Sequence, residues 1–222
     1  MIPTGRGRMV RLDILSDPIC PWCYIGKRQL DRALQERPDN PFRIEWHPFQ
    51  LNPDMPEGGM PRADYVAAKF GDRAPEIYGA DGRIATAARE AGLTLNLAAI
   101  GRTPNTLDAH RLIHWAGLEG RQTAVVSSLF RAYFEDGRDI GDHAVLLDIA
   151  VAAGFDREVV ARLLASDADA DDIRARDAHA RARGVSGVPT FVVAETHVVT
   201  GAQPPDLWLK VIDELAGQAT GA

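Results

Sequence analysis

The sequence predicts an α/β fold in which a β-containing domain is interrupted by an all-helical insertion. Three observations indicate this fold: β-type patterns occur near the start of the chain, they return near its end, and helical patterns fill the stretch between them. We therefore expect a discontinuous domain of residues 9–55 and 184–222 around a helical domain of residues 62–183, with residues 1–8 as a disordered lead-in.

The first part of the chain has the pattern of a strand–helix–strand unit. Residues 9–17 are β-rich, and the following "PWCYIGKRQLDRALQERP" places apolar residues at helical spacing until Pro38. Residues 41–51 then alternate large apolar and polar residues, which indicates a second strand. A short unit of this kind predicts two parallel strands joined by the helix.

The middle of the chain is predicted to be helical almost throughout. Residues 52–61, "NPDMPEGGMP", are predicted to form a loop. Short helical patterns, most of them closed by a glycine, follow from residue 62 to residue 183. Asn105, Asp142 and Asp156 stand where N-caps are expected. Two late strands in "VPTFVVAE" and "THVVTG" and a terminal helix in "PPDLWLKVIDELAG" complete the fold.

Charge and hydropathy exclude two classes of partner. The chain has 222 residues, a net charge of −6 and no basic face in its sequence, so we expect no nucleic-acid partner. No apolar run approaches the ~20 residues of a membrane-spanning helix, so we expect no membrane partner. The N-terminal "MIPTGRGRMV" lacks the apolar stretch of a secretory signal, and the predicted location is therefore the cytoplasm.

The two cysteines of the chain, Cys20 and Cys23, both fall within "SDPICPWCYIGKRQL", where a strand ends and a helix begins. The unpaired N–H groups and the dipole at a helix N-terminus would stabilise a thiolate at Cys20. Cys23 lies one turn inside the helix, and Pro21 suits the first helical position. The pattern predicts a reversible dithiol with an exposed attacking Cys20 and a shielded resolving Cys23.

Two simpler interpretations of the cysteines compete with this one. Half of a zinc site would need further ligands, and His110 and His114, one helical turn apart, would have to dock on Cys20. A pair of inert core cysteines would not require Pro-Trp between them at the opening of a helix. The motif in its strand-to-helix context favours redox chemistry.

The stretch "GVSGVPTFVV" places Pro189 at the entrance of a late strand, where proline cannot donate to the sheet. The simpler interpretation is a trans proline that opens an edge strand. The alternative is a cis Val188–Pro189 bond that presents the backbone of Val188 to a substrate beside Cys20. Its late position, in a chain with a dithiol near its start, favours the cis form.

These motifs, together with "FQLNPDMPEGG", "NTLDAHRLIHWA", "LFRAYFEDGRDIGD" and "VTGAQP", resemble the DsbA family of the thioredoxin-fold superfamily, in particular its cytosolic FrnE-like branch. The resemblance covers the chain after residue 9. It implies a thioredoxin fold interrupted by helices and a thiol–disulfide oxidoreductase or isomerase activity. Carried over by position, Cys20 is the nucleophile, Cys23 the resolving thiol and Pro189 the cis-proline, with Val188 presenting backbone to the substrate.

One departure from the family pattern lies between the cysteines. Periplasmic DsbA proteins have a histidine where this chain has Trp22, and an indole stabilises a neighbouring thiolate less than an imidazole does. We therefore expect a weaker oxidant than the periplasmic relatives. A cytosolic redox poise would keep the dithiol reduced and favour reduction or isomerisation.

Two other functional hypotheses stay open. Kappa-class glutathione transferases and 2-hydroxychromene-2-carboxylate isomerases resemble this chain in architecture but usually carry serine at the position of Cys20, and serine cannot exchange disulfides. A third hypothesis is a non-catalytic dithiol protein whose helical domain docks on a partner. Protein disulfides or glutathione are the expected partners, no bound cofactor other than the redox-active disulfide is expected, and a homodimer is a candidate assembly.

The remaining candidate residues are assigned to substrate binding. Pro21 and Trp22 lie between the cysteines, while Asn105 and His110, from "NTLDAH", could line a cleft that faces Cys20. For the latter two, an N-cap and a buried, hydrogen-bonded histidine are the simpler alternatives.

Overall fold

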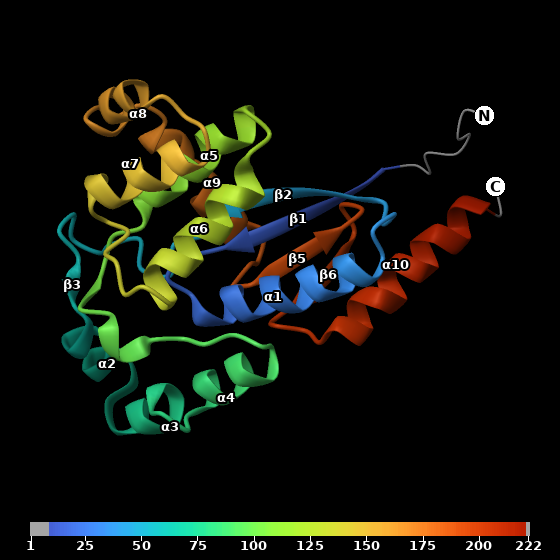
Figure 1. Ribbon diagram of the computed structural model, residues 1–222, viewed down its shortest axis with the longest axis horizontal. Coiled ribbons are helices and arrows are strands. Elements are labelled where there is room, and N and C mark those ends of the chain that lie inside the picture. Colours follow the sequence, from blue (N-terminus) through green and yellow to red (C-terminus); the bar gives the residue numbers. More distant parts are fainter. Residues whose placement is uncertain (1–8, 221–222) are drawn as a thin grey trace.

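A four-stranded sheet with the order β2-β1-β5-β6 forms the centre of the molecule (Figure 1). Its strands are β1 (Val10–Ser16), β2 (Phe42–Pro48), β5 (Thr190–Val193) and β6 (His197–Thr200). β1 pairs with β2 in parallel and with β5 in antiparallel orientation, and β5 pairs with β6 in antiparallel orientation. The predicted parallel βαβ unit and the α/β class are confirmed.

This computed structural model describes residues 9–220, except for the side chains of residues 218–220. The lead-in expected at residues 1–8 lies outside the described residues. None of the described helices is both long and apolar enough to cross a membrane.

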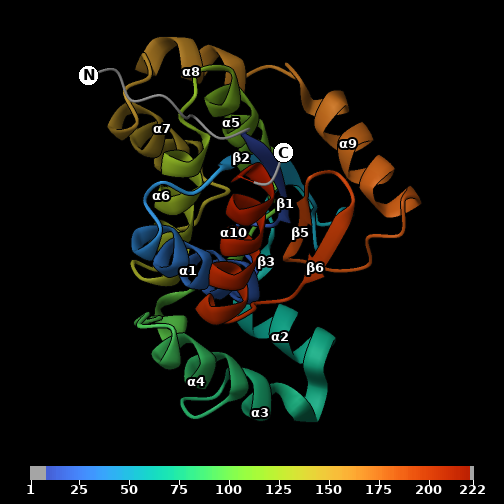
Figure 2. The ribbon, with the colours of Figure 1, turned by 90° about the vertical axis from the view of Figure 1, so that its right-hand side faces the viewer.

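Two helices from opposite ends of the chain cover one face of the sheet (Figure 2). They are α1 (Pro21–Glu36) and α10 (Pro205–Thr220), which pack against each other. Trp208 of α10 is fully buried, and its ring lies 4.7 Å from that of Phe191 on β5, measured between centroids. The terminal helix thus holds the late strands and the first helix together.

The segment between β2 and β5 contains the helices that the sequence predicted, together with elements that it did not. The helices are α2 (Arg62–Phe70), α3 (Ala74–Tyr78), α4 (Arg83–Glu90), α5 (Leu107–Leu118), α6 (Gln122–Phe134), α7 (His143–Ala152), α8 (Arg157–Leu164) and α9 (Ala170–Ala182). The short helix α3, the 3₁₀ turns at Gly71–Arg73 and Leu97–Ala99, and an antiparallel ladder of β3 (Met60–Pro61) with β4 (Arg102–Thr103) were not expected. They depend on contacts between distant parts of the chain rather than on local periodicity.

Two of the three predicted N-caps are confirmed. Asp142 accepts the backbone N–H of Ala144, and Asp156 accepts that of Val159. The third prediction is wrong by one position, because Thr106 occupies the N-cap of α5 and Asn105 precedes it.

Figure 1 shows α2, α3 and α4 as one group below the sheet, whereas α5 to α8 form a second group above it. α9 lies on the side of the sheet opposite α10 and contacts β2 (Figure 2). The redox motif at the start of α1 therefore lies close to helices of the insertion as well as to the sheet.

Candidate active site

The turn between β1 and α1 places the two cysteines as the sequence predicted. The backbone N–H of Cys20 donates to the carbonyl of Asp17 at 2.9 Å, which closes the turn after the strand. Cys20 is the N-cap of α1, and its carbonyl accepts the backbone N–H of Cys23 at 3.1 Å. Pro21 occupies the first helical position, where its missing N–H costs no hydrogen bond.

The cysteines lie near each other as free thiols, but the expected contrast in their exposure is wrong. Cys20 is 3% exposed and Cys23 is 1% exposed. Cys20 is covered because the loop before β5 lies over it, so that its Sγ donates a hydrogen bond to the carbonyl of Val188 at 3.6 Å. An attack by Cys20 on a substrate therefore requires this cover to open.

The loop before β5 brings residues from the end of the chain to the dithiol. The peptide bond between Val188 and Pro189 is cis. The ring of Pro189 lies against Gly26 of α1, where an added Cβ would stand only 3.1 Å from Pro189 Cγ. The absence of a side chain at Gly26 allows α1 and this loop to approach closely.

The two thiols differ in electrostatics more than in exposure. Burial raises the pKa of Cys23 well above its usual value, and the neighbouring Cys20 adds to this shift. The nearby Ser16 hydroxyl and the backbone of Asp17 partly oppose it. Burial thus holds Cys23 in its protonated form, and the position of Cys20 at the helix cap leaves it the candidate nucleophile.

A buried acid and a buried base lie next to the dithiol turn. Asp17 is fully buried, its Oδ2 accepts the N–H of Leu51 at 2.6 Å, and its Oδ1 lies 3.8 Å from Nε2 of His110. Burial raises the pKa of Asp17 to about 7 and lowers that of His110 to about 4. Both groups are therefore neutral over much of the range between these two values.

His110 does not line a cleft open to solvent in this structure. It is 2% exposed and stands behind the active-site turn beside Asp17. The structure favours the buried histidine that the sequence offered as an alternative, although Nε2 has no hydrogen-bond partner among the described residues.

Asn105 connects neighbouring loops through hydrogen bonds of its side chain. Its Nδ2 donates to the carbonyl of Met55 at 2.6 Å, while its Oδ1 accepts the N–H of Leu107 at 2.9 Å and a proton of Gln50 Nε2 at 3.3 Å. All these contacts stabilise the start of α5, so Asn105 has a structural role in this conformation.

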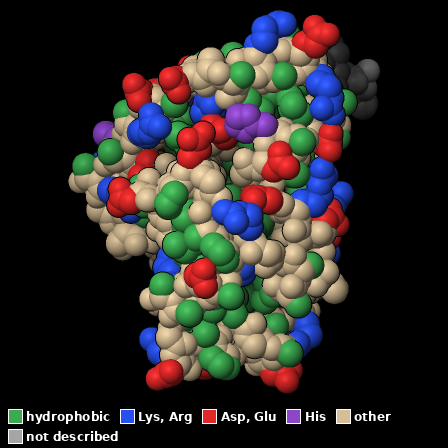
Figure 3. Space-filling view, turned by 90° about the vertical axis from the view of Figure 1, so that its left-hand side faces the viewer, with side chains coloured by type: hydrophobic (Ala, Val, Ile, Leu, Met, Phe, Trp, Pro, Cys, Tyr) green, Lys and Arg blue, Asp and Glu red, His purple; other side chains and the backbone are tan. Residues whose placement is uncertain are grey.

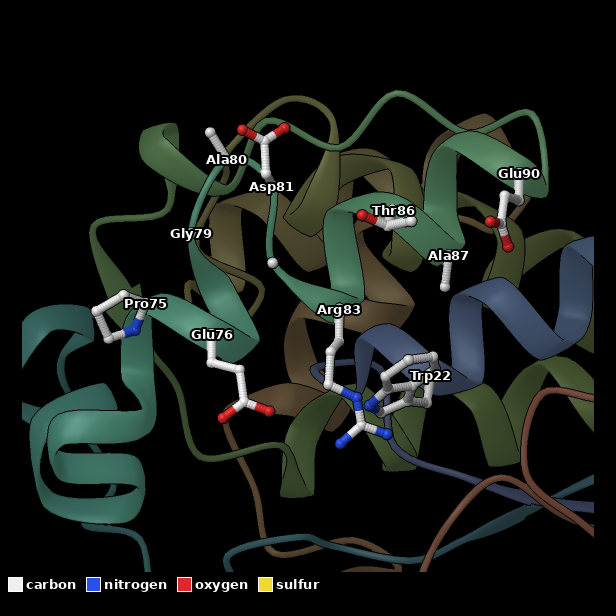
Figure 4. A pocket seen from close by; sticks show the side chains of 11 residues that line it. Trp22, Pro75, Glu76, Gly79, Ala80, Asp81, Arg83, Thr86, Ala87 and Glu90 are labelled. Carbon is white, nitrogen blue, oxygen red and sulfur yellow. The ribbon is translucent and has the colours of Figure 1, made fainter.

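Trp22 borders a cavity of about 670 Å³ whose other walls come from the insertion. Figure 4 shows Trp22 of α1 and Arg83 of α4 at one end of this cavity and Glu76 of α3 opposite. The lining also includes the acidic residues Asp81 and Glu90. A substrate that reaches Cys20 from this side would meet an aromatic ring and groups of both charges.

The metal-site alternative finds no support in the geometry of the donors. Among the described residues, the grouping of three metal-ligand side chains is Asp13, Glu45 and His47, which includes neither cysteine. Arg11 already pairs with Asp13 in that group at 2.7 Å. His114 accepts a hydrogen bond from Arg176 at 3.0 Å and takes no part in the dithiol turn.

Sequence reasoning missed three residues near the site. Asp17 lies inside the quoted motif and directly follows β1, so a carboxyl group at a strand end was the available signal. Tyr78 ends α3, and the short pattern around it gave no signal. Burial raises the pKa of Tyr78, Arg62 partly opposes this shift, and Cys20 adds a small contribution to it. Ser16, the last residue of β1, is buried beside Cys23.

Comparison with known proteins decides the family. Residues 11–213 match the model of the DSBA-like thioredoxin domain. The chain belongs to the DsbA family. Membership confirms the predicted thioredoxin fold, and it places this DsbA-family chain among thiol–disulfide oxidoreductases.

Individual proteins are similar to this chain over nearly its whole length. A probable DsbA oxidoreductase from Streptomyces coelicolor is 31% identical, with a TM-score of 0.81 over 94% of this chain and 90% of that one. The uncharacterised protein YwbO of Bacillus subtilis is 27% identical over 92% of this chain and 96% of its own length. The cytosolic disulfide reductase DsbM of Pseudomonas aeruginosa, solved with GSH, shares the fold at 20% identity, with a TM-score of 0.67 over 93% of this chain and 99% of that one.

Proposed function

We propose that this protein exchanges disulfides with a protein or small-thiol substrate through the dithiol Cys20-Pro-Trp-Cys23. The observation that carries the proposal is the placement of two free, neighbouring thiols at the N-terminus of α1, with Cys20 at the cap and facing the Val188 carbonyl. Cys20 stands at the helix N-terminus, where the helix dipole is positive, whereas burial keeps Cys23 protonated.

The reaction follows from these positions. The Cys20 thiolate attacks one sulfur of a substrate disulfide, a mixed disulfide forms, and the other substrate sulfur leaves as a thiolate that takes up a proton. Cys23 then loses its proton and attacks Cys20, which releases the second substrate thiolate and leaves a Cys20–Cys23 disulfide. The substrate gains two electrons and the dithiol loses them.

The Val188 carbonyl has two uses in this sequence. In the reduced state it accepts a hydrogen bond from the Cys20 thiol, with 3.6 Å between Sγ and the carbonyl oxygen. A Cys20 thiolate has no proton to donate, so its formation frees the carbonyl. The backbone of Val188 can then pair with an extended substrate beside the sulfur under attack.

We propose that glutathione is the co-substrate that reduces the Cys20–Cys23 disulfide back to the dithiol. We also propose that the protein belongs to the cytosolic FrnE-like branch. The cavity at Trp22 supports this choice, because Arg83 can pair with a carboxylate and Glu76 or Asp81 with an ammonium group. A fold neighbour, the cytosolic reductase DsbM, was solved with GSH. A homodimer stays a prediction.

A glutathione-dependent isomerase is the second candidate. A 2-hydroxychromene-2-carboxylate isomerase shares the fold, with a TM-score of 0.70 at 17% identity, over 95% of this chain and 98% of that one. Cysteines at both positions of the motif favour disulfide exchange, since isomerisation needs only one polar group near the glutathione sulfur.

The two candidates differ in their need for Cys23. We expect Cys23→Ala to lose turnover in the glutathione-dependent reduction of insulin disulfides, while its unfolding free energy falls by only about 1 kcal/mol. Cys20→Ser should be inactive. Retained turnover in Cys23→Ala, together with glutathione-dependent conversion of a small electrophile, would favour the isomerase instead.

A further inference from the structure

Arg62, the first residue of α2, is a buried cation without an acidic partner. It is 8% exposed, and among the described residues no carboxylate oxygen lies within ion-pair distance of it. Its Nη1 donates a long hydrogen bond of 3.4 Å to Thr103 Oγ1, and its Nη2 has no hydrogen-bond partner in the described part of the chain. This guanidinium therefore has donor capacity at Nη2 that the described residues leave unused, while Tyr78 receives a hydrogen-bond contribution from Arg62.

The surroundings of Arg62 are aromatic and neutral. Its Cζ lies 4.6 Å from the ring centroid of Tyr78 and 5.6 Å from that of Tyr65. Burial raises the pKa of Tyr78, and it raises that of Tyr133 to about 12, so neither hydroxyl supplies a negative charge near neutral pH. Cation–π contacts offset part of the desolvation of a buried arginine, but they do not neutralise its charge.

A second cavity, which shares Gly79 and Ala80 with the one at Trp22, opens beside this arginine. It has a volume of about 930 Å³ and lies between α2, α4 and residues 93–101. Most of its wall is apolar, as shown by Val66, Ala85, Ala88, Leu93, Leu95 and Ile100. Figure 3 shows apolar side chains gathered among few charges on the lower part of the face that carries α2 and α3. We call this space the Arg62 cavity.

We propose that the Arg62 cavity binds a small organic anion, with an apolar body against the aliphatic wall and one carboxylate, sulfonate or phosphate group at Arg62. The volume lies in the range of sites for drug-sized ligands, which are mostly apolar with few polar groups. A buried, unpartnered guanidinium is the group that would orient an anion there, because it offers a planar set of donors.

Tyr78 connects this cavity to the dithiol. The tyrosine borders the cavity, contacts Arg62 and lies within electrostatic range of Cys20. A bound anion would therefore contact a tyrosine whose pKa also responds, to a small extent, to Cys20. This connection rests on the proposed redox function, whereas the binding of the anion does not.

A matched pair of fluorescent probes tests the site. 1-Anilinonaphthalene-8-sulfonate and N-phenyl-1-naphthylamine have similar apolar bodies, but only the first carries a sulfonate. We expect the folded full-length protein to bind the sulfonate at one site about tenfold or more tightly than the neutral probe, as for a charge-assisted hydrogen bond. Arg62→Gln should abolish this preference.

Two further variants locate the effect. Arg89→Gln removes the same charge from the exposed rim of the cavity, where Arg89 lies 3.5 Å from Asp81, and should keep the preference. Ala85→Trp should fill the cavity from α4 and weaken both probes while Arg62 stays in place.

Thermal melts of each variant confirm that the compared proteins are folded. Equal affinity of the two probes for the wild-type protein, or an unchanged preference in Arg62→Gln, would overturn the proposal. The probes are measured in the absence of thiol substrates. A failed redox assay would therefore leave the binding result unaffected, and a failed binding test would leave the proposed redox function unaffected.

Discussion

At the scale of single residues, the two cysteines differ in their surroundings more than in their exposure. Both thiols are buried, but Cys23 carries the raised pKa, and Cys20 has the position at the helix cap. Asp17 adds a second buried titratable group behind the same turn. The redox site therefore combines groups whose protonation depends on the folded environment.

The buried Asp17 predicts a distinctive dependence of stability on pH. Its pKa is raised from 3.8 to about 7, so the folded protein keeps a proton that the unfolded chain has lost between these values. Stability therefore falls as pH rises from about 4 to about 7, and this contribution levels off above pH 7. The Asp17→Asn variant cannot lose a proton at this position. Its unfolding free energy, measured relative to wild type, should therefore rise by about 3–4 kcal/mol between pH 4 and pH 7.

Urea unfolding of both proteins between pH 4 and pH 8 measures this difference. His110, whose lowered pKa of about 4 acts in the opposite direction, is present in both proteins and cancels to a first approximation. Asparagine keeps only one of the two acceptor oxygens that bind the N–H groups of Leu51 and Ile19, and the loss of the other adds an offset that does not depend on this titration. Parallel curves for the two proteins would show that Asp17 titrates normally.

At the scale of secondary-structure elements, α1 is fixed to the insertion by aromatic stacking. The ring of Tyr24 lies 5.0 Å from that of Phe130 and 5.9 Å from that of Phe134, measured between centroids. The hydroxyl of Tyr24 also donates to Glu135 just after α6. These contacts hold the first turn of α1, and hence both cysteines, against α6.

Removing the central ring should destabilise the protein strongly. Phe130 is 0% exposed, so Phe130→Ala leaves a cavity and should lower the free energy of unfolding by about 3–5 kcal/mol. Tyr24→Phe keeps the stacking and loses one hydrogen bond, and it should cost only about 1 kcal/mol. Urea denaturation compares the two variants, and similar losses would mean that stacking is not the main contact.

At the scale of the whole molecule, one hydrophobic core crosses the proposed domain boundary. The main core cluster includes Leu12 and Ile14 of β1 together with Leu112 of α5. α9 is also fixed to the other side of the sheet, since Asp177 accepts the N–H of Gln50 at 2.8 Å, and Arg181 lies over the ring of Phe49. The sheet and the insertion therefore share their stabilising contacts.

This shared core predicts a single unfolding transition, even though the chain is proposed to contain a thioredoxin-like domain and a helical insertion. Tryptophan fluorescence, which comes from Trp22 of α1, Trp46 of β2, Trp115 of α5 and Trp208 of α10, should change together with far-UV circular dichroism. Two separate transitions would show that the insertion is a stable unit of its own.

The sequence predicted those features that depend on local patterns. The βαβ unit, the dithiol at the cap of α1 and the N-caps Asp142 and Asp156 all follow from short stretches of residues. The cover over Cys20 did not follow, because it comes from Val188, far away in the chain. The proximity of Asp17 to His110 and the short α3 likewise depend on tertiary packing, which no local period reveals.

The most direct test of the central claim is mass spectrometry of the intact protein after exposure to oxidised glutathione. In Cys23→Ser, we predict one lasting glutathione adduct, which peptide mapping places on Cys20. The wild-type protein should instead end with an internal disulfide, and Cys20→Ser should form little adduct. A stable adduct on Cys23 in Cys20→Ser, with none on Cys20 in Cys23→Ser, would contradict the assigned roles.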